Sequence, residues 1–248
     1  LDKYKLDKRI IIYRNNINYE RSYSRNLGFR KSSGKFVTLL DSDDLLDKNI
    51  FSEFRKFYGI NNKYNIYFSN FKIYNSHTQY TSKNKSFKEL YDIKLLSNGN
   101  YLSNICVFFR KKITDKIKFD ENPNIIGIED YDFNLRAVYN YGNAIKFSHK
   151  SLGIVNDHES RSVNMDNIYN AEKRFVFFKN KIFTNKDYIY FSNQIKRNII
   201  STASLYVSLI SIKNKNKFKS LKYLCISIMN NIKIIVEKRF YYIIYKLL

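Results

Sequence analysis

The sequence predicts an α/β fold, in which a mixed, mostly parallel sheet is flanked by helices and followed by a helical C-terminal region. Short apolar runs alternate with helically spaced segments over the first two thirds of the chain, which is typical of strand–helix–strand units. Three carboxylates directly follow one apolar run, and open α/β sheets bind ligands at the carboxyl ends of their strands. After Met165 the segments become long and helical. We therefore expect a catalytic-type domain over residues 1–164 and a basic helical region over residues 165–248.

Composition limits the protein classes to consider. The chain has 248 residues, 44% of them hydrophobic, which is enough to bury a sizeable core and excludes a disordered tail. Its net charge of +22 accompanies a composition with a single Pro and no Trp. This indicates a bias in the composition of the whole sequence and not a selected basic patch. Cys106 and Cys225 lie far apart without Cys or His neighbours at ligand spacing, so we expect no zinc site or disulfide framework and a reducing cytoplasm. No signal peptide is visible, and the chain opens on Leu1, which suggests a missing N-terminus.

The opening segment predicts a right-handed βαβ unit. Residues 9–13 form a short apolar strand, residues 22–31 a helix that ends near Gly34, and residues 36–40 a strand buried on both faces. The strand direction places Asp41, Asp43 and Asp44 at the carboxyl edge of the sheet.

These three aspartates carry the first functional hypothesis. Clustered carboxylates repel one another and are costly to desolvate, so a bound cation would stabilise them. An oxygen-rich site suits Mg²⁺ or Mn²⁺ that also holds substrate phosphates. The alternative is a solvated turn whose last carboxylates cap the next helix, and for an isolated D-x-D this alternative is favoured.

The middle of the chain continues the alternation of helices and strands. We predict a helix from Asp47 or Asn49 to about Tyr58, then an exposed loop or hairpin after the first of two further strands. In order, the expected elements are a strand at 66–74, the loop at 75–88, a helix at 91–96, a buried strand at 105–109, a helix at 111–117 and a strand at 144–147.

A second acidic motif, Glu129-Asp130, opens a helix that we expect to end at Gly142. Acidic groups on a first helical turn gain from the helix dipole, by about 0.3–1 kcal/mol, so capping alone could explain them. The functional alternative is a general base that takes a proton from an attacking hydroxyl group. Asp132 faces elsewhere on the helix and is expected to be structural.

Two stretches together resemble a known family. Ser24-Arg25-Asn26-Leu27-Gly28 and the run from Ser33 to Asp44 resemble the "A-R-N-x-G … G-x-(Y/F)-(I/V)-x-(F/L)-L-D-x-D-D" pattern of family 2 glycosyltransferases, inverting enzymes of the Rossmann-like GT-A fold. Ser24 replaces the usual Ala. Glu129-Asp130 resembles the family's "E-D" motif, and residues 156–162 resemble its "H-x-x-S" region.

The resemblance implies a metal-dependent inverting transfer from a nucleotide-sugar donor to a glycan or lipid-linked acceptor, in bacterial surface polysaccharide or lipooligosaccharide synthesis. The cofactor implied is Mn²⁺ or Mg²⁺. The residue roles that it implies are nucleotide contact for Asp41, metal binding for Asp43 and His158, diphosphate contact for Arg161 and Arg25, general base for Asp130, and acceptor positioning for Glu129.

The resemblance covers most of residues 8–162 but lacks the family's first strand–helix–strand unit, which grips the nucleotide. A glycosyltransferase fragment without activity is therefore one alternative. A haloacid-dehalogenase-like phosphatase is another, although this chain has Leu45 where that family usually has Thr or Val, and it offers no role for Glu129-Asp130. Nucleic-acid binding is not expected, because no recognition motif is visible.

The region from residue 165 onward is basic, with sixteen Lys and Arg against four acids. Its longest uncharged run, residues 198–212, is shorter than the ~20 residues that a membrane-spanning helix requires. Two interpretations stay open. The helices could lie on the anionic inner face of the plasma membrane, or they could form a subdomain on the sheet with Lys side chains in solvent.

Overall fold

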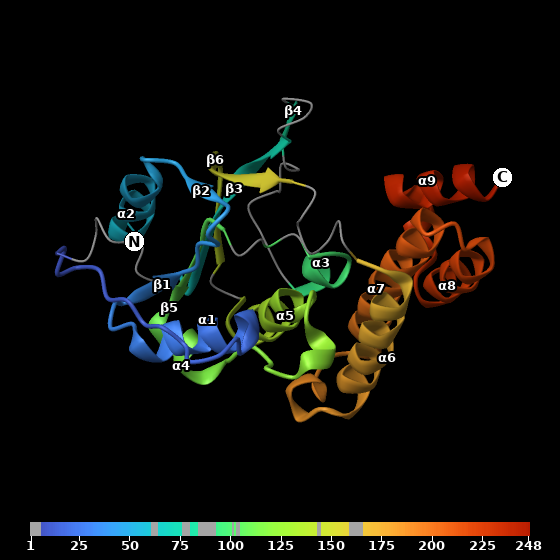
Figure 1. Ribbon diagram of the computed structural model, residues 1–248, viewed down its shortest axis with the longest axis horizontal. Coiled ribbons are helices and arrows are strands. Elements are labelled where there is room, and N and C mark those ends of the chain that lie inside the picture. Colours follow the sequence, from blue (N-terminus) through green and yellow to red (C-terminus); the bar gives the residue numbers. More distant parts are fainter. Residues whose placement is uncertain are drawn as a thin grey trace.

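The computed structural model describes residues 6–60, 64–75, 80–83, 93–100, 102, 105–142, 145–158 and 166–248. A sheet with covering helices comes first in the chain, and a group of helices follows it (Figure 1). The first part contains α1 (Glu20–Lys31), β1 (Phe36–Thr38), β2 (Leu45–Leu46), α2 (Ile50–Ile60), β3 (Ile66–Asn75), β4 (Tyr80–Lys83), α3 (Ile93–Ser97), β5 (Val107–Arg110), α4 (Lys111–Lys116), the 3-10 helix η2 (Pro123–Ile125), α5 (Glu129–Tyr141) and β6 (Ile145–Asp157). The second part contains α6 (Ile168–Thr184), η4 (Lys186–Tyr188), α7 (Asn193–Lys213), α8 (Lys217–Asn230), η5 (Ile232–Val236) and α9 (Lys238–Leu247).

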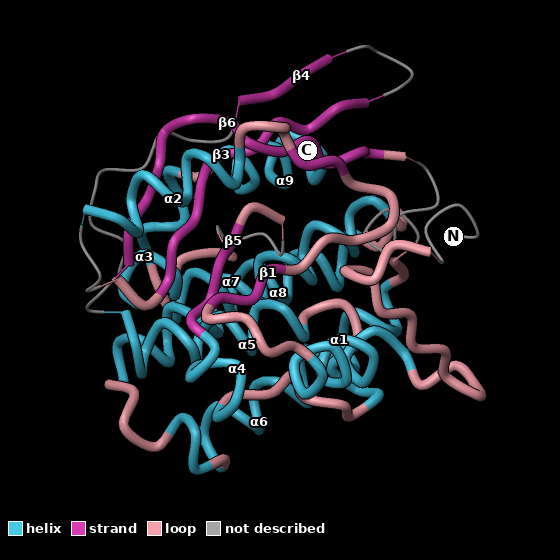
Figure 2. Tube along the Cα trace, turned by 90° about the vertical axis from the view of Figure 1, so that its left-hand side faces the viewer, coloured by secondary structure: helices cyan, strands magenta, loops and turns pink. Residues whose placement is uncertain are grey.

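The sheet is mixed and has the strand order β1-β5-β3-β6-β2. β4 pairs with the C-terminal half of β3 and lies far from β1 (Figure 2). β1, β3 and β6 run in the same direction, and β5 is inserted between β1 and β3 in the opposite direction. The prediction of a mixed α/β sheet is confirmed. The prediction that most pairings are parallel is wrong, because only the β3–β6 pairing is parallel in the described part of the chain. The chain enters β5 through α3, which packs on α5 and α7 and does not form a crossover helix on the sheet.

Side chains along each strand point alternately to the two faces of the sheet, and they form one apolar layer on each face. Phe68 and Phe109 point to the face covered by α1, α4 and α5, and this cluster extends into α6 and α7. Tyr67 and Phe108, their neighbours in sequence, point to the opposite face, where they pack with Phe54 of α2. Successive side chains of a strand face opposite sides, so the aromatic runs of β3 and β5 fill both layers at once.

The strand predicted for residues 9–13 does not form. This segment is irregular, and Ile11 is 69% exposed. A strand requires a paired neighbour, and among the described residues β1 pairs only with β5. β1 is therefore an edge strand, and the prediction that residues 36–40 are buried on both faces is wrong: the strand ends at Thr38 and Leu40 is 51% exposed.

Most other predicted elements are present with small shifts of their ends. α1, α2, β3, α3, β5, α4 and α5 match their predicted segments, and α5 ends at Gly142 as expected. The strand predicted at 144–147 is part of the longer β6. β4 forms a hairpin with β3, while much of the predicted 75–88 loop lies outside the described residues.

The predicted C-terminal helices are present. α7 and α8 approach closely through small side chains, because Ser201 and Ser208 of α7 hydrogen-bond to Ser227 and Ser220 of α8. α6 and α7 also contribute to the main apolar cluster under the sheet. Within the described ranges, no helix combines the length and the apolar character needed to cross a bilayer.

Gly153 of β6 lies against a buried cysteine. A Cβ atom at this position would come within 2.5 Å of the Cys106 Sγ atom, so no larger residue fits without displacing backbone or side chain. Cys106 is fully buried, and this burial raises the pKa of its thiol to about 12. Cys106 is therefore a structural residue and stays protonated.

Candidate active site

Arg25 of α1 joins the two acidic motifs. It lies on the buried face of the helix together with Ser22, Asn26 and Phe29. Its Nη2 atom donates to Asp41 Oδ1 at 3.0 Å and to Asp41 Oδ2 at 3.2 Å, and its Nη1 atom donates to Glu129 Oε1 at 3.2 Å. The loop after β1 and the start of α5, which are far apart in the sequence, therefore meet at one guanidinium group.

Asn26, which the sequence analysis gave no role, locks α1 in place. Its Nδ2 donates to the Phe119 carbonyl oxygen at 2.9 Å and to Glu121 Oε1 at 2.7 Å, while its Oδ1 accepts from the Phe119 N–H at 2.9 Å. The Arg-Asn pair within the quoted motif was the signal for this contact. One residue of the pair binds the carboxylates and the other fixes the helix.

Glu129 is buried and satisfied by protein groups. Its side chain is 3% exposed, and its Oε2 accepts from the Gly127 N–H at 2.6 Å. Gly127 has φ +99°, a left-handed conformation that favours glycine. Arg21 Nε also lies 3.6 Å from Glu129 Oε1. The structure thus places Glu129 at the junction of α1, the Gly127 turn and α5, and its predicted role in acceptor positioning stays a prediction.

Asp130 has an environment that suits a general base. Its Oδ1 accepts from the Tyr131 N–H at 2.7 Å and its Oδ2 from Asn100 Nδ2 at 3.0 Å. Burial of the carboxyl group, followed by the negative charge of Glu129, raises the pKa of Asp130 to about 6. A base is most effective when its pKa lies near the working pH. Asn100 is a second residue that the sequence analysis missed, since only the fold brings it to α5.

Asp43 and His158, the two predicted metal ligands, lie together. Asp43 Oδ2 is 3.1 Å from His158 Nε2, and both side chains are partly exposed, at 44% and 38%. Two ligands at about 2.1 Å from an octahedral ion, in adjacent positions, are about 3 Å apart, so this pair fits a divalent ion. Among the described residues, no three His, Cys, Asp or Glu side chains form a metal cluster. An ion on this pair would therefore need water or substrate oxygens as further ligands.

Contacts with β6 hold the loop that carries Asp43 and Asp44. Asp44 Oδ1 accepts from the Asn156 N–H at 3.2 Å, and Asn156 Nδ2 donates to the Asp43 carbonyl oxygen, so β6 holds the loop after β1. Asp44 does not lie at a helix N-terminus, since α2 begins only at Ile50. Arg161, the other predicted diphosphate ligand, lies outside the described residues.

Residues 1–118 match the family described as Glycosyl transferase family 2, a match that includes Arg25, Asp41 and Asp43 and ends before Glu129. These residues belong to glycosyltransferase family 2. The family 2 domain confirms the predicted family, and the phosphatase alternative is not retained.

Two known proteins resemble the chain over longer ranges. An uncharacterized glycosyltransferase of Methanocaldococcus jannaschii is 31% identical over 144 residues, which are 54% of this chain and 46% of that protein. The chain thus spans about half the length of this curated relative. The crystal structure of S. aureus TarS in complex with UDP-GlcNAc has a TM-score of 0.54 and 13% identity, covering 91% of this chain and 76% of that chain. This likeness concerns the fold, which is of the expected GT-A type.

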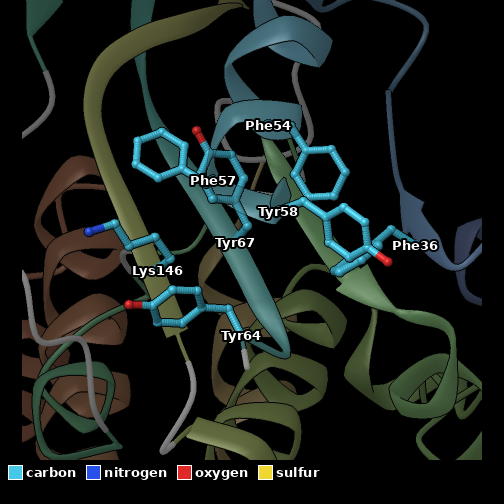
Figure 3. A pocket seen from close by; sticks show the side chains of 7 residues that line it. All are labelled: Phe36, Phe54, Phe57, Tyr58, Tyr64, Tyr67 and Lys146. Atoms are coloured by element: carbon cyan, nitrogen blue, oxygen red, sulfur yellow. The ribbon is translucent and has the colours of Figure 1, made fainter. Parts of the chain in front are cut away.

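Two hollows in the described part of the molecule lie apart from the family 2 carboxylates. A small pocket between α2 and the sheet holds about 10 Å³, room for about one water molecule. Its lining is mostly aromatic and consists of Phe36, Phe54, Phe57, Tyr58, Tyr64, Tyr67 and Lys146 (Figure 3). An open hollow of about 400 Å³ beside β1 is lined by Lys35, Phe36, Thr38, Phe51, Phe54, Arg55, Tyr58 and Phe108. The predicted site residues line neither hollow.

Replacing Arg25 by Met is expected to lower the free energy of unfolding by about 3 kcal/mol, because it leaves buried Glu129 without its closest cation. Arg21→Met is the matched control, since Arg21 lies on the same helix, faces the same carboxylate at 3.6 Å and is 39% exposed. We expect this control to cost less than about 1 kcal/mol. Urea unfolding of both variants measures the difference, and equal losses would contradict the bridging role of Arg25.

Proposed function

We propose that this chain is an inverting glycosyltransferase that moves a sugar from a nucleotide-sugar donor to a hydroxyl group of a glycan or lipid-linked acceptor. The observation that carries the proposal is the Arg25 bridge, which holds Asp41 of the first acidic motif and Glu129 of the second motif on one guanidinium group. Asp130, the adjacent residue, then faces the same region with its pKa raised to about 6. UDP-GlcNAc in the structure of TarS supports a nucleotide sugar as the donor.

Asp130 acts as the general base in this proposal. The acceptor hydroxyl oxygen attacks the anomeric carbon of the donor, and its proton passes to an Oδ atom of Asp130. The new carbon–oxygen bond forms on the face opposite the bond to the diphosphate, which breaks and leaves with its electron pair as nucleoside diphosphate. The sugar configuration is therefore inverted. The N–H of Tyr131 and the amide of Asn100 orient the carboxylate of Asp130 for this transfer.

Asp43 and His158 are the residues that would hold Mn²⁺ or Mg²⁺. The ion would neutralise the charge that develops on the departing diphosphate. Asp41, in the loop after β1, contacts the nucleotide side of the donor, and Arg25 orients the Asp41 carboxylate through two hydrogen bonds. Arg25 and Arg161 remain our candidates for contact with the diphosphate.

The proposal is tested by a donor screen. The chain is incubated with UDP, GDP and dTDP sugars, with Mn²⁺, Mg²⁺ or EDTA, and release of nucleoside diphosphate and the thermal midpoint are measured. We expect one donor class to give metal-dependent hydrolysis and a metal-dependent thermal shift. A chain that binds none of these donors would leave the alternative of an inactive glycosyltransferase fragment.

We also infer that α8 lies against an anionic membrane, on the cytoplasmic face where a lipid-linked acceptor for surface polysaccharide or lipooligosaccharide synthesis is available. α8 packs on α7 through serines and exposes an apolar stripe at helical spacing, formed by Phe218, Leu221, Cys225 and Met229. Residues 213–248 contain nine Lys and Arg and one acid, Glu237. Basic side chains around exposed apolar groups favour an anionic lipid surface, by about 1 kcal/mol for each cation near it.

The membrane surface is tested by co-sedimentation with vesicles. We expect binding to vesicles that contain phosphatidylglycerol, weaker binding at high salt, and little binding to neutral phosphatidylcholine. The double variant Phe218→Ser and Met229→Ser removes two side chains that are 81% and 83% exposed, and should reduce binding about tenfold or more. Phe183→Ser on α6, 53% exposed, is the control. Equal binding of both vesicle types would contradict the proposal.

A further inference from the structure

α6 presents two cations to the segment that carries the candidate base. Arg174 and Lys181 are seven residues apart and therefore lie on one face of the helix. Their side chains are only 14% and 8% exposed. Arg174 contacts the turn just before Glu129 and Asp130, and Lys181 contacts the first turn of α5 just after them. The two cations thus enclose the second acidic motif from the C-terminal helical region.

Arg174 supports the Gly127 turn. Its Nη1 atom donates to the Ile126 carbonyl oxygen at 3.3 Å and lies 3.3 Å from the position that a Cβ atom of residue 127 would occupy. Its Nη2 atom pairs with Asp166, which also accepts from the Tyr206 hydroxyl at 2.8 Å. Gly127, whose N–H donates a hydrogen bond to Glu129, belongs to this same turn. Arg174 therefore fixes the backbone that leads into the acidic motif.

Lys181 supports the first turn of α5. Its Nζ atom lies 2.6 Å from Asp132 Oδ1 and 2.6 Å from Asp120 Oδ2. Asp132 is fully buried and also pairs with Arg136 at 2.5 Å, while the Tyr188 hydroxyl donates to it at 2.7 Å. The prediction that Asp132 is structural agrees with these contacts. They connect α5 to α6 and to η4 through one carboxylate.

Buried ion pairs contribute little net stability, because desolvation offsets much of their attraction, but they hold their partners in one geometry. We propose that Arg174 and Lys181 are positioning residues, which fix the start of α5 so that Asp130 faces the acceptor hydroxyl. This inference rests on the proposed function. Catalytic groups displaced by about 1 Å can lose about 100-fold in rate. The basic helical region that follows residue 164 then helps to position the candidate base.

The test compares five variants of the full chain with the donor found by the screen. Lys181→Met and Arg174→Met are paired with the controls Lys179→Met and Lys173→Met, which change exposed residues of the same helix. All assays are run well below the thermal midpoint of the least stable variant. We expect the two buried variants to lose about 10- to 100-fold in kcat with donor KM changed less than about twofold, while the controls keep both constants. Lys181→Arg, which keeps the cation, should recover most of the lost kcat.

Three outcomes separate this inference from the proposed function. Unchanged kcat in both buried variants overturns the positioning role and leaves the proposed function standing. Donor KM and kcat that change together, or a fall in thermal midpoint without a fall in kcat, also overturn it, because either points to a merely structural role. If Lys181→Met does not fold, Asp120→Asn replaces it, since this variant removes one partner of Lys181 and should lower kcat in the same direction. Full transfer activity of an Asp130→Asn variant would instead overturn the base assignment itself.

Discussion

Replacing Asp130 by Asn is expected to reduce kcat for transfer by about 10²- to 10⁴-fold while donor binding is retained, because an amide cannot accept the proton of the acceptor hydroxyl. Donor binding is measured by thermal shift or calorimetry, and transfer by release of nucleoside diphosphate in the presence of acceptor. Asp115→Asn on α4 is the control, since its carboxylate pairs with Lys111 and is 53% exposed. Transfer at the wild-type rate by Asp130→Asn would show that another group takes the proton.

The pH dependence gives a second check of the same residue. Asp130 must be ionised to act as base, so kcat/KM should fall as the pH is lowered through about 6, the value to which burial and Glu129 raise its pKa. Glu129→Gln removes the second of these causes. The pKa of Asp130 should then decrease, and the acid limb should move to lower pH. An acid limb that stays in place would show that the limb does not report Asp130.

Replacing Asp43 by Ala is expected to abolish the metal-dependent part of donor binding, because it removes one of the two side chains that converge on the candidate metal position. In the wild type, donor and Mn²⁺ at about 100 times the dissociation constant should stabilise the fold by about 2.7 kcal/mol. The variant should show the same small shift with Mn²⁺ as with EDTA. Asp7→Ala, a change in the irregular N-terminal segment, should keep the full shift. Retention of the metal-dependent shift in Asp43→Ala would contradict the ligand assignment.

The sequence predicts most elements whose information is local. α5 follows from helical spacing and from Gly142 at its end, and the buried strand β5 follows from its apolar run. The meeting of the two acidic motifs was implied by the family resemblance. The bridging role of Arg25 could not be predicted, because its two carboxylate partners lie on two other segments of the chain, and the resemblance implied only a diphosphate contact for this residue.

The errors concern features that depend on pairing partners. Residues 9–13 have the composition of a strand, but composition supplies no neighbour for their backbone groups, and the segment stays outside the sheet. β1 is at the edge of the described sheet for the same reason. The antiparallel pairing of β5 with β1 and β3 is likewise set by tertiary contacts, which no local pattern indicates. Lys181 likewise has the sequence pattern of a surface lysine, and only its contact with Asp132 shows its place in the core.

The two cysteines differ in a way that has a practical use. Cys106 lies behind Gly153 as a protonated, inaccessible thiol, whereas Cys225 is exposed on α8. A maleimide fluorophore should therefore attach to this chain at a single position, without any engineered cysteine. Because Cys225 belongs to the apolar stripe, the emission colour of such a dye would report directly whether this side of the molecule enters lipid.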